Sequence, residues 1–414
     1  MVSGPRRQYA GGVAARYLLL GTALLLLALG LVMVYSASSI TASVKEGSDW
    51  FYLVRQALFA VGGWGIAMLV ARIDYRVLKD RAWMIWSACI ALLSVVLVIG
   101  LASHGAQRWI PLGIMNLQPS ELAKVACVLL VAGLAVEWNR GRMDTRTFAI
   151  RAAIATLVPS AFIIKQPDMG TTVTLVAAVA VVLILAGMQL RWIFGALAIA
   201  LPVAVLFVTR SDYRMERVVG FLDPWANASD KGYQSVQALL AFGSGGLDGV
   251  GLGLSRQKFF YLPEAYTDFI LAIIGEETGL IGTLLVVAAF AMFAWAGFKI
   301  ATGARDPYGR LVAGGVTGMI SFQAVLNMAA VTGLMPVTGK PLPFLSYGGS
   351  SMLVTMIGVG LLLSVSEYGM LVPRAVRPRA KSKETRFEST DERRGNRRPR
   401  LSGIDGGRTT RRGA

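Results

Sequence analysis

The 414-residue sequence has little histidine, cysteine or charge, and each shortage excludes a class of protein. Its single histidine, His104, excludes a metal site built on several histidines and a histidine-dependent catalytic triad. Its two cysteines, Cys89 and Cys127, lie in apolar segments, so we expect small buried side chains and no disulfide framework. Charged residues make up 16% of the chain, too few to cover the surface of a soluble protein of this length.

Apolar residues are abundant instead. They make up 55% of the chain, and the mean hydropathy is +0.57. Repeated apolar runs of about 20 residues predict an all-α polytopic membrane protein, since such a run can cross the bilayer as a helix. We predict ten transmembrane helices, near 17–36, 51–71, 82–102, 119–137, 147–165, 170–188, 192–209, 268–298, 311–335 and 349–371. The first run is too long for a signal peptide, so we expect it to remain as the first helix.

Basic residues predict the orientation of these helices. An even number of crossings places both termini on one side, and short loops on that side carry Arg72, Arg140, Arg191 and Lys299 with further Lys and Arg. Because basic loops stay in the cytoplasm, both termini are predicted to be cytoplasmic. The predicted parts are a cytoplasmic N-terminal segment at 1–16, a membrane domain at 17–371 and a tail at 372–414.

The tail supplies about half of the net charge of +17, with fourteen Lys and Arg against five Asp and Glu from Arg374 onward. Its composition is typical of a disordered segment that rests on anionic lipid or binds a partner protein, and we favour this over nucleic-acid binding.

Polar residues gather on the predicted outer side. A long outer loop at 210–267, between the seventh and eighth helices, carries both signs of charge, and a smaller one at 103–118 contains Arg108. The glycine-rich segment 243–253 lacks the Lys-Ser/Thr ending of a phosphate-binding loop, and we interpret it as a close-packed re-entrant or interfacial loop. This distribution places the chemistry on the outer face.

The segment 262–269 ends the long outer loop and contains Glu264 and Asp268. Two interpretations of Asp268 follow from the residues. Thr267 and Asp268 can begin the eighth helix, as N-cap and dipole partner. Alternatively, Asp268 is a general base whose low-dielectric surroundings raise the pKa of its carboxylate, with Glu264 tuning it or holding a sugar hydroxyl.

Other charges inside or beside apolar runs also have two interpretations. Glu121 and Lys124 are three residues apart, which suits a local ion pair, while Lys124 together with Arg108 also suits an anionic headgroup such as pyrophosphate. Asp168 suits the N-terminus of the sixth helix and is equally a candidate site residue. Glu276 and Glu277 lie deep in the eighth helix, and we expect them to be paired for structural reasons.

Several motifs occur in a fixed order along residues 17–371: VYSAS at 34–38, RWI at 108–110, QPSELAK at 118–124, QPDMGT at 166–171, FLDPW at 221–225, LPEAYTDF at 262–269 and PLPFLSYGGSS at 341–351. In this order they resemble the SEDS family of cell-wall polymerases. At position 265 the chain has Ala, which resembles the family members that act in cell division; members that act in elongation more often have Gln there. Tyr266 departs from the family pattern, which usually has His there and therefore a group that titrates near neutrality.

The resemblance implies a ten-helix glycosyltransferase that polymerises lipid II into peptidoglycan together with a class B penicillin-binding protein, and an essential aspartate at Asp268. We predict that Asp268 removes a proton from the acceptor sugar hydroxyl. That oxygen then attacks the lipid-linked sugar with inversion, and undecaprenyl pyrophosphate leaves. Arg108 and Lys124 are expected to steady the leaving group. Glu121, Asp168 and Glu264 complete the predicted substrate contacts.

Some questions stay open at the level of sequence. A divalent cation, Mg or Mn, could share the stabilisation of the leaving group, or Asp268 could hold a metal that activates the hydroxyl. A lipid II flippase and a non-catalytic divisome scaffold are the alternative functions; the absence of an obvious internal repeat speaks against the flippase. The expected location is the bacterial cytoplasmic membrane at the division septum, with further divisome proteins bound through the basic tail.

Overall fold

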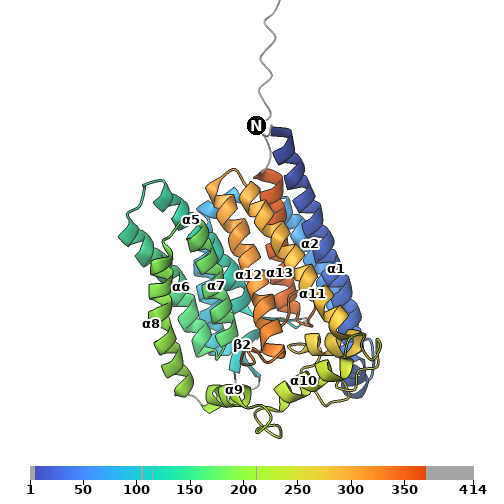
Figure 1. The fold of residues 1–414 in the computed structure, drawn as a ribbon. Helices are drawn as coiled ribbons and strands as arrows, with labels where there is room; N and C mark the ends of the chain where they lie inside the picture. Colours follow the sequence, from blue (N-terminus) through green and yellow to red (C-terminus); the bar gives the residue numbers. More distant parts are fainter. Residues whose placement is uncertain (1–4, 104–105, 114, 211, 370–414) are drawn as a thin grey trace, which may run out of the picture. The chain divides into compact units, whose positions relative to one another are not determined.

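The computed structural model describes residues 5–103, 106–113, 115–210 and 212–369, and the part it describes is mostly helical (Figure 1). His104 and the predicted tail lie outside the described residues. The helices are α1 (Pro5–Glu46), α2 (Phe51–Ala71), α3 (Arg76–Asp80), α4 (Ala82–Ile99), α5 (Pro119–Asn139), α6 (Thr145–Lys165), α7 (Met169–Leu185), α8 (Leu190–Thr209), α9 (Asp212–Leu222), α10 (Tyr233–Gly245), α11 (Ile270–Gly303), α12 (Pro307–Val331) and α13 (Gly349–Tyr368).

Each of the ten predicted apolar runs overlaps a helix of this set. Among the described residues, seven helices are long and apolar enough to cross a membrane, and α4 and α7 contain shorter apolar helical segments. The polytopic helical architecture is therefore confirmed, while ten crossings and the cytoplasmic termini stay predictions. The first helix is longer than predicted: α1 continues past residue 36 to Glu46 because no Gly or Pro interrupts 31–46.

The core lies around α5, α12 and α13, which other parts of the protein mostly bury, whereas few residues of α2 are buried. Helix α13 packs on α2, α11 packs on α1 and α12, and α5 packs on α4 and α7. Glycine allows close approach at α12: a Cβ on Gly315 would lie 2.5 Å from Val182 Cγ2 and 2.7 Å from Val128 Cγ1. Small residues at helix contacts are typical of membrane bundles, where van der Waals packing drives association.

A small antiparallel sheet corrects the all-α prediction. Its strands are β1 (Leu101–Ser103), β2 (Ala106–Pro111) and β3 (Asn116–Leu117), in the order β1-β2-β3, with Ile110 opposite Leu117. The segment 103–118 was predicted as an outer loop, and the first residues of β1 as the end of the preceding helix. Trp109 and Ile110 favour a strand, and a turn in which Leu112 N donates to Met115 O at 3.0 Å lets the chain reverse. The sheet fixes the position of Arg108 in β2.

The segment between α8 and α11 folds beside the same end of the bundle as the sheet. Figure 1 shows β2, α9 and α10 together at the end opposite to the start of α1. The chain after α10 then lies along α11: Val250 N donates to Glu276 O at 2.9 Å, and Gly251 N donates to Glu277 O at 3.1 Å. A Cβ on Gly249 would lie 2.3 Å from Glu277 O, so the glycine-rich segment 243–253 is close-packed, as predicted. Its first three residues belong to α10.

The two buried carboxylates of α11 hold this segment in place. Glu277 accepts hydrogen bonds from Ser36 Oγ at 2.6 and 2.7 Å and forms an ion pair with Lys258 Nζ at 3.4 Å. Glu276 accepts from Arg256 N at 3.0 Å and from the hydroxyl of Ser255. The structural interpretation of this pair is confirmed.

Candidate functional site

Asp268 lies in a compact turn before α11. Both Thr267 N and Phe269 N donate to Glu264 O at 3.2 Å, and Glu264 has a left-handed backbone, with φ at 56°. The N-cap of α11 is Phe269, and no side chain caps it. The interpretation of Thr267 and Asp268 as the start of the helix is therefore wrong, because the turn on Glu264 delays the helix to Ile270. Glu264 is exposed and accepts a hydrogen bond from Thr267 Oγ1 at 2.7 Å.

Helix α12 and the segment before α13 hold Asp268 from the other side. Asn327 Nδ2 donates to Asp268 O at 2.8 Å and to Lys340 O at 2.7 Å. Gly339 lies against the side chains: a Cβ there would be 3.4 Å from Asp268 Oδ2 and 3.6 Å from Arg217 Nη1. Arg217, on α9, also donates to Val337 O at 2.9 Å. The site is therefore assembled from segments that are far apart in the sequence.

The Asp268 carboxylate is partly buried, and in the described part of the chain it forms no hydrogen bond or ion pair. Burial raises its pKa to about 6, helped by the charge of Glu264 and opposed by Lys340, Arg217 and Arg108. A carboxylate with this pKa is mostly ionised at neutral pH, yet it accepts a proton more readily than an ordinary aspartate.

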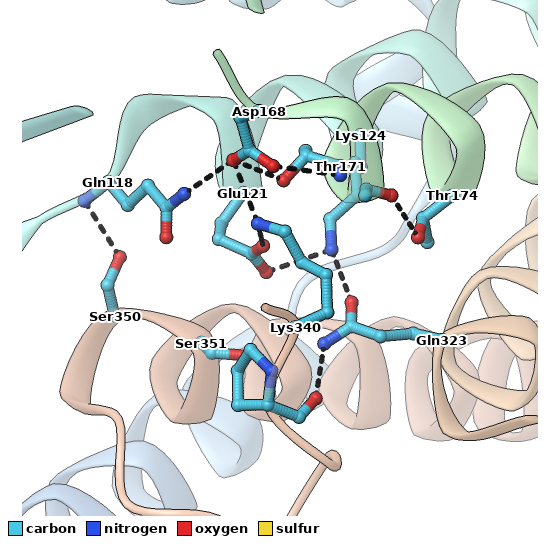
Figure 2. A network of polar contacts seen from close by, with 12 residues as sticks. Gln118, Glu121, Lys124, Asp168, Thr171, Thr174, Gln323, Lys340, Ser350 and Ser351 are labelled. Carbon is cyan, nitrogen blue, oxygen red and sulfur yellow. Dashed lines mark hydrogen bonds and ion pairs between the residues drawn. The ribbon is translucent and has the colours of Figure 1, made fainter. Parts of the chain in front are cut away.

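Asp168 lies in a buried polar network beside this site (Figure 2). It is the N-cap of α7, as predicted, and accepts from Thr171 N at 3.1 Å. Lys340 Nζ donates to Asp168 Oδ2 at 2.8 Å, and Gln118 Nε2 donates to the same oxygen at 2.9 Å. Burial alone would raise the pKa of Asp168, but Lys340, Arg108 and Thr171 more than offset it and lower the pKa to about 2. Asp168 therefore stays ionised and does not exchange protons near neutral pH.

The predicted ion pair between Glu121 and Lys124 is present in the same network, with Lys124 Nζ 2.9 Å from Glu121 Oε2 (Figure 2). Both side chains are at most 2% exposed. Lys124 Nζ also donates to Gln323 Oε1 at 2.6 Å, and Lys340 Nζ lies 3.8 Å from Glu121 Oε1. Two carboxylates and two ammonium groups thus balance each other inside the bundle. Binding of substrate by Glu121, Lys124 or Asp168 stays a prediction.

Arg108 connects the sheet to the turn between α6 and α7. Its Nε donates to Gln166 O at 2.9 Å and its Nη2 to Pro167 O at 2.5 Å. These bonds hold a cation close enough to help lower the pKa of Asp168 and to oppose the rise in the pKa of Asp268.

Tyr266 packs in a cluster of three tyrosine rings next to Asp268. Its ring centroid lies 4.8 Å from that of Tyr52 and 5.9 Å from that of Tyr347. Tyr347 N donates to Tyr266 O at 2.9 Å, which joins the turn to the segment before α13. Burial raises the pKa of Tyr266, so the phenol stays protonated at neutral pH and does not titrate as a histidine would.

Three residues of the site were not singled out from the sequence: Arg217, Asn327 and Lys340. Lys340 lies between two apolar runs with no motif of its own to mark it, and Arg217 is one of many charges in the long outer loop. Asn327 was detectable as an amide in an apolar helix, because such polar groups in membrane helices usually have a partner. Among the described residues, no group of three or more His, Cys, Asp or Glu side chains is placed to hold a metal ion.

Comparison with known proteins gives consistent matches over most of the chain. A family model described as a cell cycle protein, and named after FtsW, RodA and SpoVE, matches residues 16–370. The probable peptidoglycan glycosyltransferase FtsW of Geobacter metallireducens is 42% identical over 340 residues, which covers 81% of this chain and 90% of that protein. Stage V sporulation protein E of Bacillus subtilis is 41% identical over 349 residues, covering 83% and 95%.

Solved structures share the fold. A chain from a study of the structural coordination of polymerization and crosslinking by a peptidoglycan synthase complex superposes with a TM-score of 0.70 at 30% identity, covering 86% of this chain and 98% of that one. The crystal structure of the rod shape determining protein RodA of Thermus thermophilus superposes with a TM-score of 0.64 at 28% identity, covering 86% and 97%.

Proposed function

Because this chain belongs to the family of FtsW, RodA and SpoVE, we propose that it polymerises lipid II into peptidoglycan glycan strands with Asp268 as the general base. The family is the SEDS family that the sequence motifs resemble. The chain is a peptidoglycan glycosyltransferase, and its similarity to relatives named FtsW favours a role in cell division.

The single observation that carries the assignment of the base is the state of the Asp268 carboxylate. It makes no hydrogen bond or ion pair with the described residues, and its pKa is raised to about 6. Carboxylates that only stabilise a fold are paired, as Asp168 and Glu277 are here. A partly exposed carboxylate without a hydrogen-bond or ion-pair partner among the described residues, with its backbone fixed by Asn327, is suited to accept a proton from a substrate.

The reaction is a single displacement. The 4-hydroxyl of the acceptor GlcNAc gives its proton to Asp268 as its oxygen bonds to the anomeric carbon of the lipid-linked MurNAc. The bond from that carbon to the pyrophosphate oxygen breaks on the opposite side, so the configuration inverts and polyprenyl pyrophosphate leaves with the electron pair. A carboxylate that was protonated at neutral pH could not begin this sequence.

Cations beside Asp268 are suited to the charge that develops on the leaving group. Arg217 and Asp268 approach Gly339 together, and Arg217 is only half-buried. Lys124, in contrast, is 1% exposed and holds Glu121 and Gln323. We therefore assign the pyrophosphate to Arg108 and Arg217, and give Lys124 a supporting role within the buried network.

The wider assignment follows the same family membership. We propose ten crossings of the cytoplasmic membrane with both termini inside, which places β2, α9, α10 and Asp268 at the outer surface, where lipid II presents its sugars. The similarity to a chain of a peptidoglycan synthase complex supports a penicillin-binding protein of class B as partner. Action at the septum, and contact of the basic tail with other division proteins, complete the proposal.

The test is polymerisation of lipid II by the purified full chain with its penicillin-binding partner, whose own catalytic serine has been removed. Wild type and Asp268→Asn are compared, since Asn has the same shape but does not accept the proton. We expect glycan chains from wild type alone. Chains from both proteins would overturn the general base. No chains from either, with lipid II translocation intact in proteoliposomes, would favour the flippase instead.

A further inference from the structure

Lys340 connects the buried charge network to the candidate base. Its ammonium is held by Asp168 at 2.8 Å and by Glu121 at 3.8 Å, and the residue is 3% exposed (Figure 2). Its backbone carbonyl shares the amide of Asn327 with the backbone carbonyl of Asp268. The lysine is thus fixed next to Asp268 through the main chain while its charge is directed toward other carboxylates.

We propose that Lys340 is a positioning residue for Asp268, and that Asp168 and Glu121 act by holding its ammonium away from that carboxylate. The proposal rests on the assignment of Asp268 as the general base. It gives Asp168 and Glu121 a role in tuning the base rather than in contacting the substrate.

The geometry shows why the lysine must be held. Lys340 has a long flexible stem, and the residue before it, Gly339, lies against both Asp268 Oδ2 and Arg217. The stem packs over Gly170, where a Cβ would lie 2.6 Å from Lys340 Cγ, and this contact leads the ammonium to Asp168. A side chain larger than hydrogen at position 170 would block that path.

The charge of Lys340 acts on Asp268 in either of two ways. An ion pair with Asp268 would lower the pKa of the carboxylate strongly and make it a weak base. With its ammonium held by Asp168, Lys340 only limits how far burial and Glu264 raise the pKa of Asp268. The carboxylate therefore stays ionised near neutrality. The other charges facing Asp268 are Arg217 from α9 and Arg108 from β2, and both oppose that rise as well.

Substitutions of the two partners in one ion pair should therefore move the pH dependence in opposite directions. The acidic limb is the part of the pH–rate profile in which the polymerisation rate falls as Asp268 is protonated. Lys340→Met removes a positive charge and so raises the pKa of Asp268, which moves this limb to higher pH by about half a pH unit. Asp168→Asn releases the ammonium toward Asp268, so the limb moves to lower pH by a similar amount. A role confined to folding would lower the rates without shifting the limb in opposite directions.

The experiment measures the rate of lipid II polymerisation against pH for the full chain with its partner protein. The variants are Lys340→Met, Asp168→Asn, the double variant and Lys340→Arg, each checked for a monodisperse chromatographic profile. Lys340→Arg retains the charge and should keep the limb near its wild-type position. The double variant should reverse the shift of Asp168→Asn, because it removes the released ammonium. This comparison still applies if Lys340→Met alone does not fold.

The outcomes separate the two proposals. A wild-type rate without any acidic limb would overturn the general base itself. If wild type shows an acidic limb near pH 6, and Asp168→Asn and the double variant show it at the same pH, only the role of Lys340 is overturned. Shifts of opposite sign in the two single variants, or reversal in the double variant, would support it.

Discussion

The side chain of Asn327, on α12, donates a hydrogen bond to the backbone carbonyl of Asp268 over 2.8 Å. The same nitrogen donates to the carbonyl of Lys340 at 2.7 Å, so one amide fixes both the candidate base and the lysine that tunes it. An amide in an apolar helix needs such partners, and here they are the two main-chain groups on which the geometry of the site depends.

Asn327→Leu is expected to lower the polymerisation rate by about tenfold to a hundredfold, because both carbonyls lose their donor and Asp268 is free to shift. The rate is measured with lipid II in excess. Asn139→Leu is the matched control, because Asn139 Nδ2 also donates to a backbone carbonyl, Ala186 O, at 2.9 Å. Asn139 is the last residue of α5, whereas Glu121 of the buried network lies in the first turn of that helix. Equal losses of rate in the two variants would show that Asn327 contributes only to stability.

Tyr266→Phe is expected to keep the rate within about threefold of wild type and to leave its pH dependence unchanged. The substitution keeps the ring contacts with Tyr52 and Tyr347 and removes a phenol that stays protonated at neutral pH. Tyr266→Ala, which removes the ring, should lower the rate and the stability together. A hundredfold loss in a well-folded Tyr266→Phe protein would instead assign proton transfer to the phenol.

Glu277→Gln is expected to lower the free energy of unfolding by about 3 kcal/mol, because it leaves the buried ammonium of Lys258 without its counter-charge. Unfolding in increasing concentrations of denaturing detergent measures the change. Glu137→Gln provides the comparison, since Glu137 pairs with Lys79 at 2.5 Å with both side chains about a quarter exposed. That variant should lose less than about 1 kcal/mol. Similar losses in both would contradict the structural role of Glu277.

Much of the fold could be predicted from the sequence because a membrane helix is encoded locally. Each apolar run overlaps its own helix, since the backbone hydrogen bonds of a helix are made between residues close together in the sequence. The strand β2 was missed because a strand of six residues depends on partners elsewhere, and no alternating pattern marks it. The end of α1 was missed because polar residues at 37–46 continue the helix beyond the apolar run.

The site could be predicted only in part, for a related reason. Asp268 was singled out because a motif resemblance and a charge at the start of an apolar run coincide there. Its surroundings come from tertiary contacts: Arg217 lies in α9, Asn327 in α12 and Lys340 in the segment before α13. Charges and amides at such separations have no shared spacing that would reveal their proximity. The N-cap interpretation failed similarly, because the turn at Glu264 shifts the start of α11 by two residues.

The pH dependence of the polymerisation rate in the wild-type complex tests the central claim most directly. A general base must be ionised to accept a proton, so the rate should fall as the pH falls through the pKa of Asp268, about 6. Measured with saturating lipid II, the predicted profile is level above this value and falls about tenfold for each pH unit below it. A rate that stays constant well below pH 6, in a protein that remains folded, would contradict the assignment of Asp268 as the base.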